Sequence, residues 1–426
     1  ADALIETLNR RRFLAQAGSA LLGGLAVGAP LMIGGTDQAV ETESGKMSQP
    51  VATPSAESRE VTLFLCGDVM TGRGIDQILP HPGKPQIFEP NMRSAAGYVE
   101  LAERATGPIR RPVEFTYVWG DALAELERVR PNARIINLET AVTASEDARP
   151  DKGIHYRMHP ANISCLTGAN IDCCVLANNH VLDWGHRGLL ETLDTLQGAR
   201  IRIAGAGRDD TGAAAPALIE LPRAGRILVF AFAMETSGVP ADWAAAKGRP
   251  GVNFLIDLSA RTIDAIARRV DAAKRRGDVV VASIHWGPNW GFAIPPEQRD
   301  FAHHLIDTAG VDVVHGHSSH HPKAIEIYHD RPVLYGCGDF LNDYEGISGY
   351  EAYRGDLALM YFPTFDAATG KLARFAMTAT QIRHFRVNRA PEEGVRWLEK
   401  MLNREGRKFG THVEHQPDNT FVLHWS

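Results

Sequence analysis

A cluster of histidines lies in the segment Val311–Lys323, which reads VDVVHGHSSHHPK. An apolar, β-branched run ends there at four imidazoles, which belong to His315, His317, His320 and His321. The neutral imidazole is the commonest metal ligand among side chains. Because open α/β sheets bind their ligands where strands end in turns, this segment predicts a metal or ligand site.

Other apolar runs of the chain also end at oxygen or nitrogen donors. The runs VTLFLC, ARIINL, IDCCVLA and DVVVASI lead to Asp68, Glu139, Asn178-Asn179-His180 and His285. Parallel strands place their carboxyl ends at one edge of a sheet, so we expect these donors to converge there with His317. Any one of them also has a plain structural explanation as a turn residue or a core histidine, but the joint pattern favours a metal site.

Helical patterns alternate with the apolar runs. Helices are expected at 122–129, 188–196, 258–276 and 296–308, and further strands at 201–204, 226–231 and 332–335. This alternation predicts an α/β fold with a largely parallel sheet and helices on its faces. The tail is expected to add a sheet edge and a packing helix, through strands at 357–362 and 372–378 and a helix at 391–407.

The donor set limits the chemistry of the predicted site. It contains carboxylates, an amide oxygen and imidazoles without a thiolate pattern, and such mixed ligation suits Mn, Fe or Zn. One carboxylate can bridge two metal ions about 3.5–4 Å apart, an arrangement used in phosphoryl hydrolysis. His180 is the predicted catalytic residue, because an imidazole there can protonate a leaving group. The alternative for the pair Asn179-His180 is a helix cap.

Further residues near these motifs are predicted to contact substrate. Arg73, Asn178 and Lys323, with Arg157 as another candidate, are expected to hold an anionic group. Two explanations stay open for the aromatic residues of this region, a cleft floor or core packing, and these residues are Trp184, Trp286, Trp290 and Phe292. The segment Asn342–Glu345 follows the last strand end and either lines the cleft or forms a plain turn.

Composition describes an ordinary globular protein. Of 426 residues 44% are hydrophobic, which is enough for a large core, in one α/β domain or in two or three domains. The formal net charge is −6 and no long basic run occurs, so the charge gives no support to nucleic-acid binding. Five cysteines without CxxC spacing indicate neither a zinc knuckle nor a disulfide framework, and we expect them to be buried.

The amino-terminal segment has the layout of an export signal. Residues 1–35 carry Arg10-Arg11-Arg12-Phe13-Leu14 before an apolar, Gly/Ala-rich stretch, and they resemble a twin-arginine signal. This predicts a periplasmic or otherwise extracytoplasmic protein, with a retained membrane anchor as the alternative. Residues 36–58 are polar and Ser/Thr/Pro-rich, which indicates a disordered linker before a domain at 59–426.

Six motifs in this order resemble the CapA capsule-synthesis (poly-γ-glutamate) family. They are GDVMTGR (67–73), NLET (137–140), ANNHVLDWG (177–185), IHWG (284–287), GHSSHHPK (316–323) and YGCGDF (335–340). The resemblance spans about residues 60–350, and that family is similar to the calcineurin-like metallophosphoesterases. It implies an α/β/β/α sandwich with one or two divalent metal ions at the carboxyl ends of the strands. The ligands that it implies are Asp68, Glu139, Asn179, His285, His317 and His320.

The motifs depart from the phosphoesterase pattern at two places. The position two residues after the first aspartate, a histidine in those enzymes, is Met70 here. The final histidine pair is separated by two serines instead of one residue. One metal position could therefore be weak, empty or completed by another side chain, for which the candidates are His315, His321 and Asp339.

Two functions of different classes remain after this comparison. The first is a metal-dependent hydrolase of the cell envelope that acts on a phosphoester or on a γ-glutamyl amide. The second is a non-catalytic accessory protein that binds an anionic polymer during capsule assembly or export. In both cases other capsule-assembly membrane proteins are the expected partners, and bound metal with turnover distinguishes the two.

Overall fold

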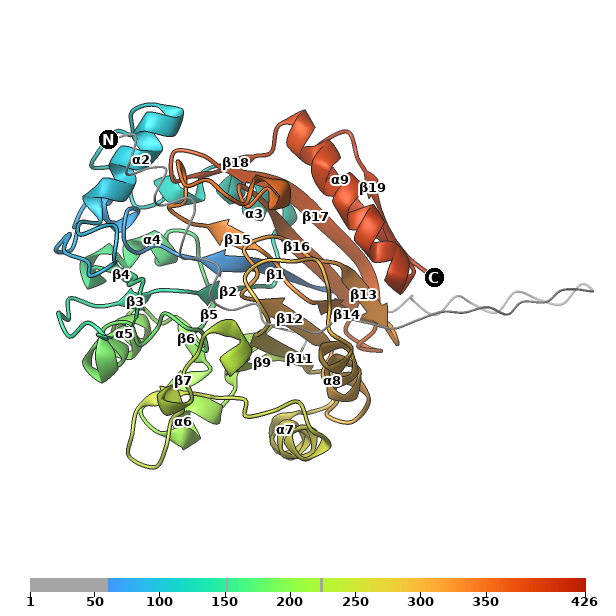
Figure 1. Ribbon diagram of the computed structural model, residues 1–426. Helices are drawn as coiled ribbons and strands as arrows, with labels where there is room; N and C mark the ends of the chain where they lie inside the picture. The colour runs from blue at the N-terminus through green and yellow to red at the C-terminus, as the bar shows by residue number, and fades with distance from the viewer. Residues whose placement is uncertain (1–59, 151, 223–224) are drawn as a thin grey trace, which may run out of the picture. The chain divides into compact units, whose positions relative to one another are not determined.

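Two large β-sheets form the centre of the fold, in a computed structural model that describes residues 60–150, 152–222 and 225–426 (Figure 1). These residues belong to one unit, Ser58–Ser426. The predicted signal at 1–35 and the linker at 36–58 lie outside the described residues. Within the described part, no helix has the length and hydrophobicity needed to cross a membrane.

The first sheet has ten strands and a parallel and an antiparallel half. Its parallel half contains β1 (Glu60–Val69), β2 (Ala133–Leu138), β5 (Cys173–Val175), β6 (Arg202–Ala204) and the short β15 (Asp339–Leu341). Its antiparallel half contains β16 (Leu357–Asp366), β17 (Leu372–Ile382), β18 (Val387–Arg389), β19 (Thr411–His415) and β20 (Thr420–Trp425). The carboxyl-terminal tail thus builds half of this sheet, more than the predicted edge.

The second sheet has six strands around a parallel centre. The parallel strands are β9 (Gly225–Ala233), β11 (Val279–His285), β12 (Val313–His317) and β14 (Arg331–Leu334). Antiparallel edge strands β8 (Ala217–Leu221) and β13 (Ile325–Tyr328) flank them. Two small two-stranded sheets pair β3 (Ala141–Val142) with β4 (Arg157–Met158) and β7 (Ala206–Gly207) with β10 (Gly251–Val252).

Helices cover the outer faces of both sheets (Figure 1). The helices are α2 (Ala96–Thr106), α3 (Asp121–Val129), α4 (Ser164–Thr167), α5 (Gly185–Gly198), α6 (Asp210–Ala214), α7 (Ala260–Ala273), α8 (Pro296–Asp307) and α9 (Glu392–Gly406). The predicted helix boundaries agree closely at α7 and α8. Ser259 caps α7 by accepting from the Thr262 backbone N–H, and Pro296 begins α8, where its missing N–H has no cost.

The alternation of side chains along β11 and its neighbours shows how the layers pack. Val229 and Val281 face the apolar core shared with the ten-stranded sheet. Leu228 and Val280 point to the opposite face and pack against α7 and α8. Successive strand residues point to opposite faces, so both faces of the six-stranded sheet are buried. This arrangement confirms the predicted α/β/β/α sandwich. All five cysteines are free and buried, as predicted.

Candidate metal centre

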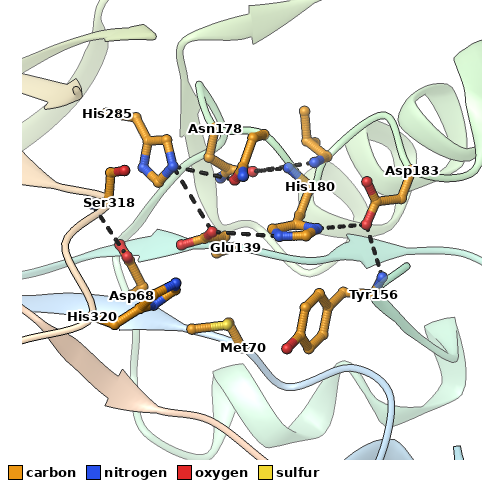
Figure 2. Close-up of polar contacts among 12 residues, drawn as sticks. Asp68, Met70, Glu139, Tyr156, Asn178, His180, Asp183, His285, Ser318 and His320 are labelled. Atoms are coloured by element: carbon orange, nitrogen blue, oxygen red, sulfur yellow. Dashed lines mark hydrogen bonds and ion pairs between the residues drawn. The ribbon is translucent and has the colours of Figure 1, made fainter. Parts of the chain in front are cut away.

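The structure brings the predicted ligands together where strands of both sheets end (Figure 2). Asp68 lies near the end of β1, and Glu139 directly follows β2 in the ten-stranded sheet. His285 and His317 end β11 and β12 of the six-stranded sheet and face each other in register. The prediction that one sheet edge carries all of them was wrong, because β9, β11, β12 and β14 pair with one another and not with β1.

Asp68, His285 and His317 form a buried group whose donor atoms lie within 4.8 Å of one another. His285 Nδ1 is 2.7 Å from His317 Nδ1, which in turn is 3.8 Å from Asp68 Oδ1. The far nitrogen of His317, Nε2, lies 2.9 Å from the Ser283 hydroxyl, which orients the ring. A carboxylate and two imidazoles at this separation are a suitable ligand set for a transition-metal ion.

Glu139 and Asn179 extend the group on its second side. Glu139 Oε1 is 3.8 Å from His285 Nε2, and Asn179 Oδ1 is 3.2 Å from the same nitrogen. The other carboxylate oxygen of Glu139, Oε2, is buried without a hydrogen-bond partner. A buried polar atom without a partner is costly, and a cation at this place would remove the cost. The residues present therefore fit a divalent metal ion.

Burial controls the protonation of this cluster. Burial, with the nearby Asp339 carboxylate, raises the pKa of Asp68 to about 7. Burial and the charge of Asp68 raise the pKa of Glu139 well above its usual value. Burial also lowers the pKa values of His285 and His317, so both rings are neutral at pH 7. Two close carboxylates among neutral imidazoles repel each other unless a proton or a metal ion lies between them.

Metal affinity is therefore expected to rise with pH. The metal-free site binds a proton on Asp68 up to about pH 7, and the pKa of Glu139 is also raised, whereas metal ligation requires both carboxylates to be ionised. Metal binding must release protons below that pH, so the apparent affinity for Mn²⁺ should increase by about tenfold or more per pH unit between pH 5.5 and 6.5. Calorimetric titration across this range measures the change. A pH-independent affinity would contradict the assignment of these carboxylates.

His320 is connected to the ligand cluster through Asp339. His320 Nδ1 lies 2.9 and 3.1 Å from the two Asp339 oxygens, and Asn342 donates to the same carboxylate. Asp339 is also the Cα partner of Asp68 across β1 and β15. Carboxylates that bind one imidazole nitrogen commonly orient the other nitrogen toward a metal ion. Figure 2 shows the His320 ring beside Asp68.

The three candidate replacements for the histidine missing at Met70 differ in their positions. His315 Nε2 is bound to the Cys66 carbonyl, and its Nδ1 lies 3.0 Å from Ser283 Oγ. His321 accepts the Gly291 backbone N–H and is bound to the Pro322 carbonyl. Both rings use their two nitrogens within the protein, which leaves Asp339, the strand neighbour of Asp68, as the remaining candidate.

The two serines between His317 and His320 also have a defined place. Ser318 adopts a positive φ of 98°, and its backbone N–H donates to Asp68 Oδ2 at 3.2 Å. The Ser318 hydroxyl donates to the Gly287 carbonyl. The extra residue therefore turns a backbone donor toward the aspartate.

His180 is held by residues that the sequence analysis did not identify. Its Nδ1 lies 2.6 Å from Asp183 Oδ2, and its Nε2 faces Glu139 Oε1 at 3.7 Å. Asp183 also accepts the Tyr156 backbone N–H and forms an ion pair with Lys152 at 3.3 Å. Burial lowers the pKa of His180 to about 4. Asp183 lies three residues after His180 in the ANNHVLDWG motif, and that spacing was the available signal.

Asn178 and Arg157, two of the residues predicted to contact substrate, have protein partners in the structure. Asn178 donates to Asn137 and to the Leu138 carbonyl, and its oxygen accepts the His180 backbone N–H, so it shapes the loop that carries His180. Lys323 is buried, which lowers its pKa to about 8. Arg157 donates to two backbone carbonyls, those of Ser145 and Lys84.

Arg73 lies in a buried ion-pair network. Its guanidinium donates to both Asp343 oxygens, at 2.8 and 2.5 Å, and to Glu89 at 3.1 Å. The Tyr98 ring lies 3.6 Å below it and the Tyr156 ring 4.4 Å away. With its donors and faces occupied, Arg73 supports the loop after β1, and the structure provides no place for an anionic substrate on it.

Replacing Arg73 by lysine should therefore reduce stability. An ammonium cannot make the two-pronged contact with Asp343 or stack between the tyrosines. We expect the free energy of unfolding to fall by about 2 kcal/mol, the value of lost charged hydrogen bonds. Urea denaturation measures this. The matched control Arg396→Lys, in an exposed pair with Glu392, should change it by less than about 0.5 kcal/mol. Equal effects of both substitutions would contradict this role.

The aromatic residues near the motifs divide into two groups. Trp184 and Trp286 are buried in the core. Trp290 is half-buried and lies 5.3 Å from the His320 ring, at the wall of a cavity that Phe292 does not line. Of the segment Asn342–Glu345, Asp343 pairs with Arg73 while the other three residues line that cavity.

Comparison with known proteins identifies several relatives. Residues 62–344 match the family model described as "Bacterial capsule synthesis protein PGA_cap". A Mycobacterium tuberculosis protein named "Probable polyglutamine synthesis accessory protein" is 48% identical over 360 residues, covering 84% of this chain and 94% of its own. The "PGA biosynthesis protein CapA" of Bacillus subtilis is 28% identical over 317 residues, covering 74% and 70%. A phosphatase from Mycoplasma pneumoniae aligns with 11% identity and a TM-score of 0.42, covering 80% of this chain and 97% of that one; this similarity is too low to support an argument.

Proposed function

The chain belongs to the bacterial capsule synthesis protein family, and we propose that it is a metal-dependent hydrolase of the cell envelope that acts on a phosphoester. One observation carries this proposal. Asp68, Glu139, His285 and His317 meet in a buried cluster with a partnerless carboxylate oxygen. Such a cluster is unfavourable without a cation and has the ligand types of a hydrolytic metal site.

The residues divide into two sets of metal ligands. Asn179 Oδ1 and Glu139 Oε1 face Nε2 of His285, and these donors form one set. His317 and Asp68, together with His320, which Asp339 orients, form the other set. Glu139 is the carboxylate placed to serve both, as the resemblance to the phosphoesterases implied. A bound divalent ion would supply a Lewis acid for the phosphoryl oxygen and lower the pKa of water.

His180 is the proton carrier in this proposal. Asp183 binds its Nδ1 and leaves Nε2 toward the cluster. Lys152 and His180 hold the pKa of Asp183 below its usual value, although burial alone would raise it. An ionised Asp183 carboxylate can only accept hydrogen bonds, so it selects the His180 tautomer that carries hydrogen on Nδ1. The Nε2 atom of His180 is then free to accept a proton and pass it on.

The family and the amino-terminal sequence support a proposal for the cellular role. The relatives named above are described as acting in PGA or polyglutamine synthesis, and we propose the same process for this chain. Export by residues 1–35 would place it outside the cytoplasm, next to capsule-assembly membrane proteins. Replacement of Arg10 and Arg11 by lysine should retain the protein in the cytoplasm, and unchanged fractionation would contradict this route.

Turnover with a metal-loaded sample tests the proposed function. Full-length protein incubated with Mn²⁺, Fe²⁺ or Zn²⁺ should hydrolyse bis(p-nitrophenyl) phosphate, and chelation should abolish the activity. The same sample is offered a γ-glutamyl p-nitroanilide, because a γ-glutamyl amide is the other substrate compatible with a polarising metal ion. If the protein binds metal and cleaves neither compound, the proposal that it is a hydrolase is wrong.

Met70 favours a second candidate function. A thioether occupies the position of a histidine ligand in the phosphoesterases, and its sulfur lies 3.7 Å from the Tyr344 hydroxyl. A weakened metal site is compatible with an accessory protein that binds an anionic polymer without cleaving it. Binding of poly-γ-glutamate without metal and without turnover would support this role, and metal-dependent turnover would exclude it as the sole function.

A further inference from the structure

A cavity of about 310 Å³ adjoins the candidate metal centre, on the side of His320. Pockets for small molecules begin at about 300 Å³. Its wall is formed mainly by one segment after β15, and the lining residues that matter here are Trp290, Tyr344, Glu345, Tyr350, Glu351 and Asp356. Asn342 also lines it, and the same side chain donates to Asp339, which orients His320. The cavity therefore lies one side chain from the proposed ligands.

Aromatic rings line the side nearest the metal centre. Trp290 and Tyr350 stack with their centroids 4.1 Å apart and an interplanar angle of 2°. His320 lies 5.3 Å from Trp290 and 5.5 Å from Tyr344, so these rings connect the cavity to the cluster. The stacking of Trp290 on Tyr350 holds both rings in position before any ligand binds.

The charge of the cavity is negative. Three carboxylates line it, those of Glu345, Glu351 and Asp356, against one guanidinium, that of Arg354. Arg354 forms two hydrogen bonds with Asp356, at 2.8 and 2.9 Å, so that pair is neutral. Among the ion pairs of the described residues, none involves Glu345 or Glu351. A hydrogen bond from the Gly349 backbone N–H lowers the pKa of Glu351, so this carboxylate is ionised at neutral pH.

We propose that this cavity binds an organic ammonium group. Aromatic faces attract cations through their quadrupole, and an aromatic wall with carboxylates is the combination that recognises alkylammonium ions. Glu345 accepts hydrogen bonds from the Thr106 hydroxyl and from the His384 and Phe385 backbone N–H groups, which are neutral donors. Its charge and that of Glu351 therefore repel a second anion, so the cavity does not suit a segment of an anionic polymer. This inference rests on the proposed function and extends it to the substrate. The substrate is a phosphoester in which one of the esterified groups carries an amine, and that group occupies the cavity.

A pair of isosteric probes tests the cavity without reference to catalysis. Choline and 3,3-dimethylbutan-1-ol have nearly the same shape and differ in charge. We expect choline to bind the full-length protein at least about tenfold more tightly, equivalent to about 1.4 kcal/mol, in calorimetric titrations with and without added Mn²⁺. Equal affinities, no binding of choline, or preferential binding of a neutral sugar such as glucose would overturn the proposal.

Matched variants locate the binding. Glu351→Gln removes one exposed carboxylate of the cavity and Tyr350→Leu removes half of the aromatic stack, and each should weaken choline binding at least threefold. Glu392→Gln, an equal change of charge on the exposed face of α9, should leave it unchanged. Unchanged binding in both cavity variants would place choline elsewhere and overturn the proposal.

The outcome is separable from that of the proposed function. If the protein binds metal and hydrolyses phosphodiesters but does not prefer choline, the hydrolase proposal stands and the ammonium-site proposal is wrong. If the protein prefers choline and binds no metal, the ammonium-site proposal stands and the hydrolase proposal is wrong. With both intact, phosphocholine diesters should be cleaved with a lower KM than the corresponding glycerol diesters.

Discussion

Replacing Glu139 by glutamine is expected to reduce bound metal to at most one equivalent and to lower kcat/KM by about 1,000-fold. The substitution keeps the size of the side chain and removes the charge placed next to His285 and His180. Loss of one preorganised group that stabilises charge costs about 100- to 1,000-fold in rate, and a bridging ligand affects both metal positions. Elemental analysis and initial rates on the same preparation measure both effects.

The folded state should survive this substitution. Glu139 is a buried carboxylate whose pKa is raised by burial and by Asp68, so a neutral amide removes repulsion from the metal-free protein. We therefore expect the metal-free variant to be at least as stable as wild type by thermal denaturation. Glu392→Gln on the surface serves as the control and should change neither metal content nor rate. Full metal content and activity in Glu139→Gln would remove Glu139 from the site.

His180→Gln is expected to separate proton transfer from metal binding. Metal content should stay at the wild-type level, while kcat for an alkyl phosphodiester falls by about 100- to 10,000-fold, the range for loss of a general acid–base residue that accepts a proton from the attacking water at Nε2 and passes it to the leaving group. A p-nitrophenyl ester should lose much less, because p-nitrophenolate leaves without a proton. This difference between leaving groups identifies proton transfer at Nε2.

Two further variants show whether the effect of His180→Gln is specific to proton transfer. Asp183→Asn should give a smaller loss and an altered pH profile, because it disturbs the His180 tautomer and not the proton carrier itself. His186→Gln replaces the exposed imidazole next to Gly185 at the start of α5 and should have no effect. Equal losses for both leaving groups in His180→Gln would show that His180 supports structure or metal binding instead.

Sequence patterns predicted the strand ends well. Asp68, Glu139, His285 and His317 each follow an apolar run, and in the structure these runs are β1, β2, β11 and β12. The runs could not show that the strands divide between two sheets, because strand partners are chosen by contacts far apart in sequence. The ten-stranded sheet also depends on β16, which pairs with β1 although the two strands are about 300 residues apart in the sequence.

Residue type alone did not reveal the surroundings of the residues that were predicted to contact substrate. Residue type gives charge but not burial, and Arg73, which was predicted to hold an anionic group, pairs with Asp343 and Glu89 inside the fold. Those partners lie 270 and 16 residues away, and neither belongs to a periodic pattern. Trp290 shows the converse case, since only the structure places its ring against Tyr350 and next to His320.

Metal analysis of the wild-type protein tests the central claim most directly. Full-length protein, purified after expression with supplemented Mn, Fe and Zn and exhaustively desalted, should contain one to two equivalents of one of these metals. The content should fall when Asp68 or His317 is replaced by alanine, while circular dichroism stays unchanged. Wild-type protein that is folded and contains no metal after supplementation would contradict the metal centre, and with it the proposed hydrolase.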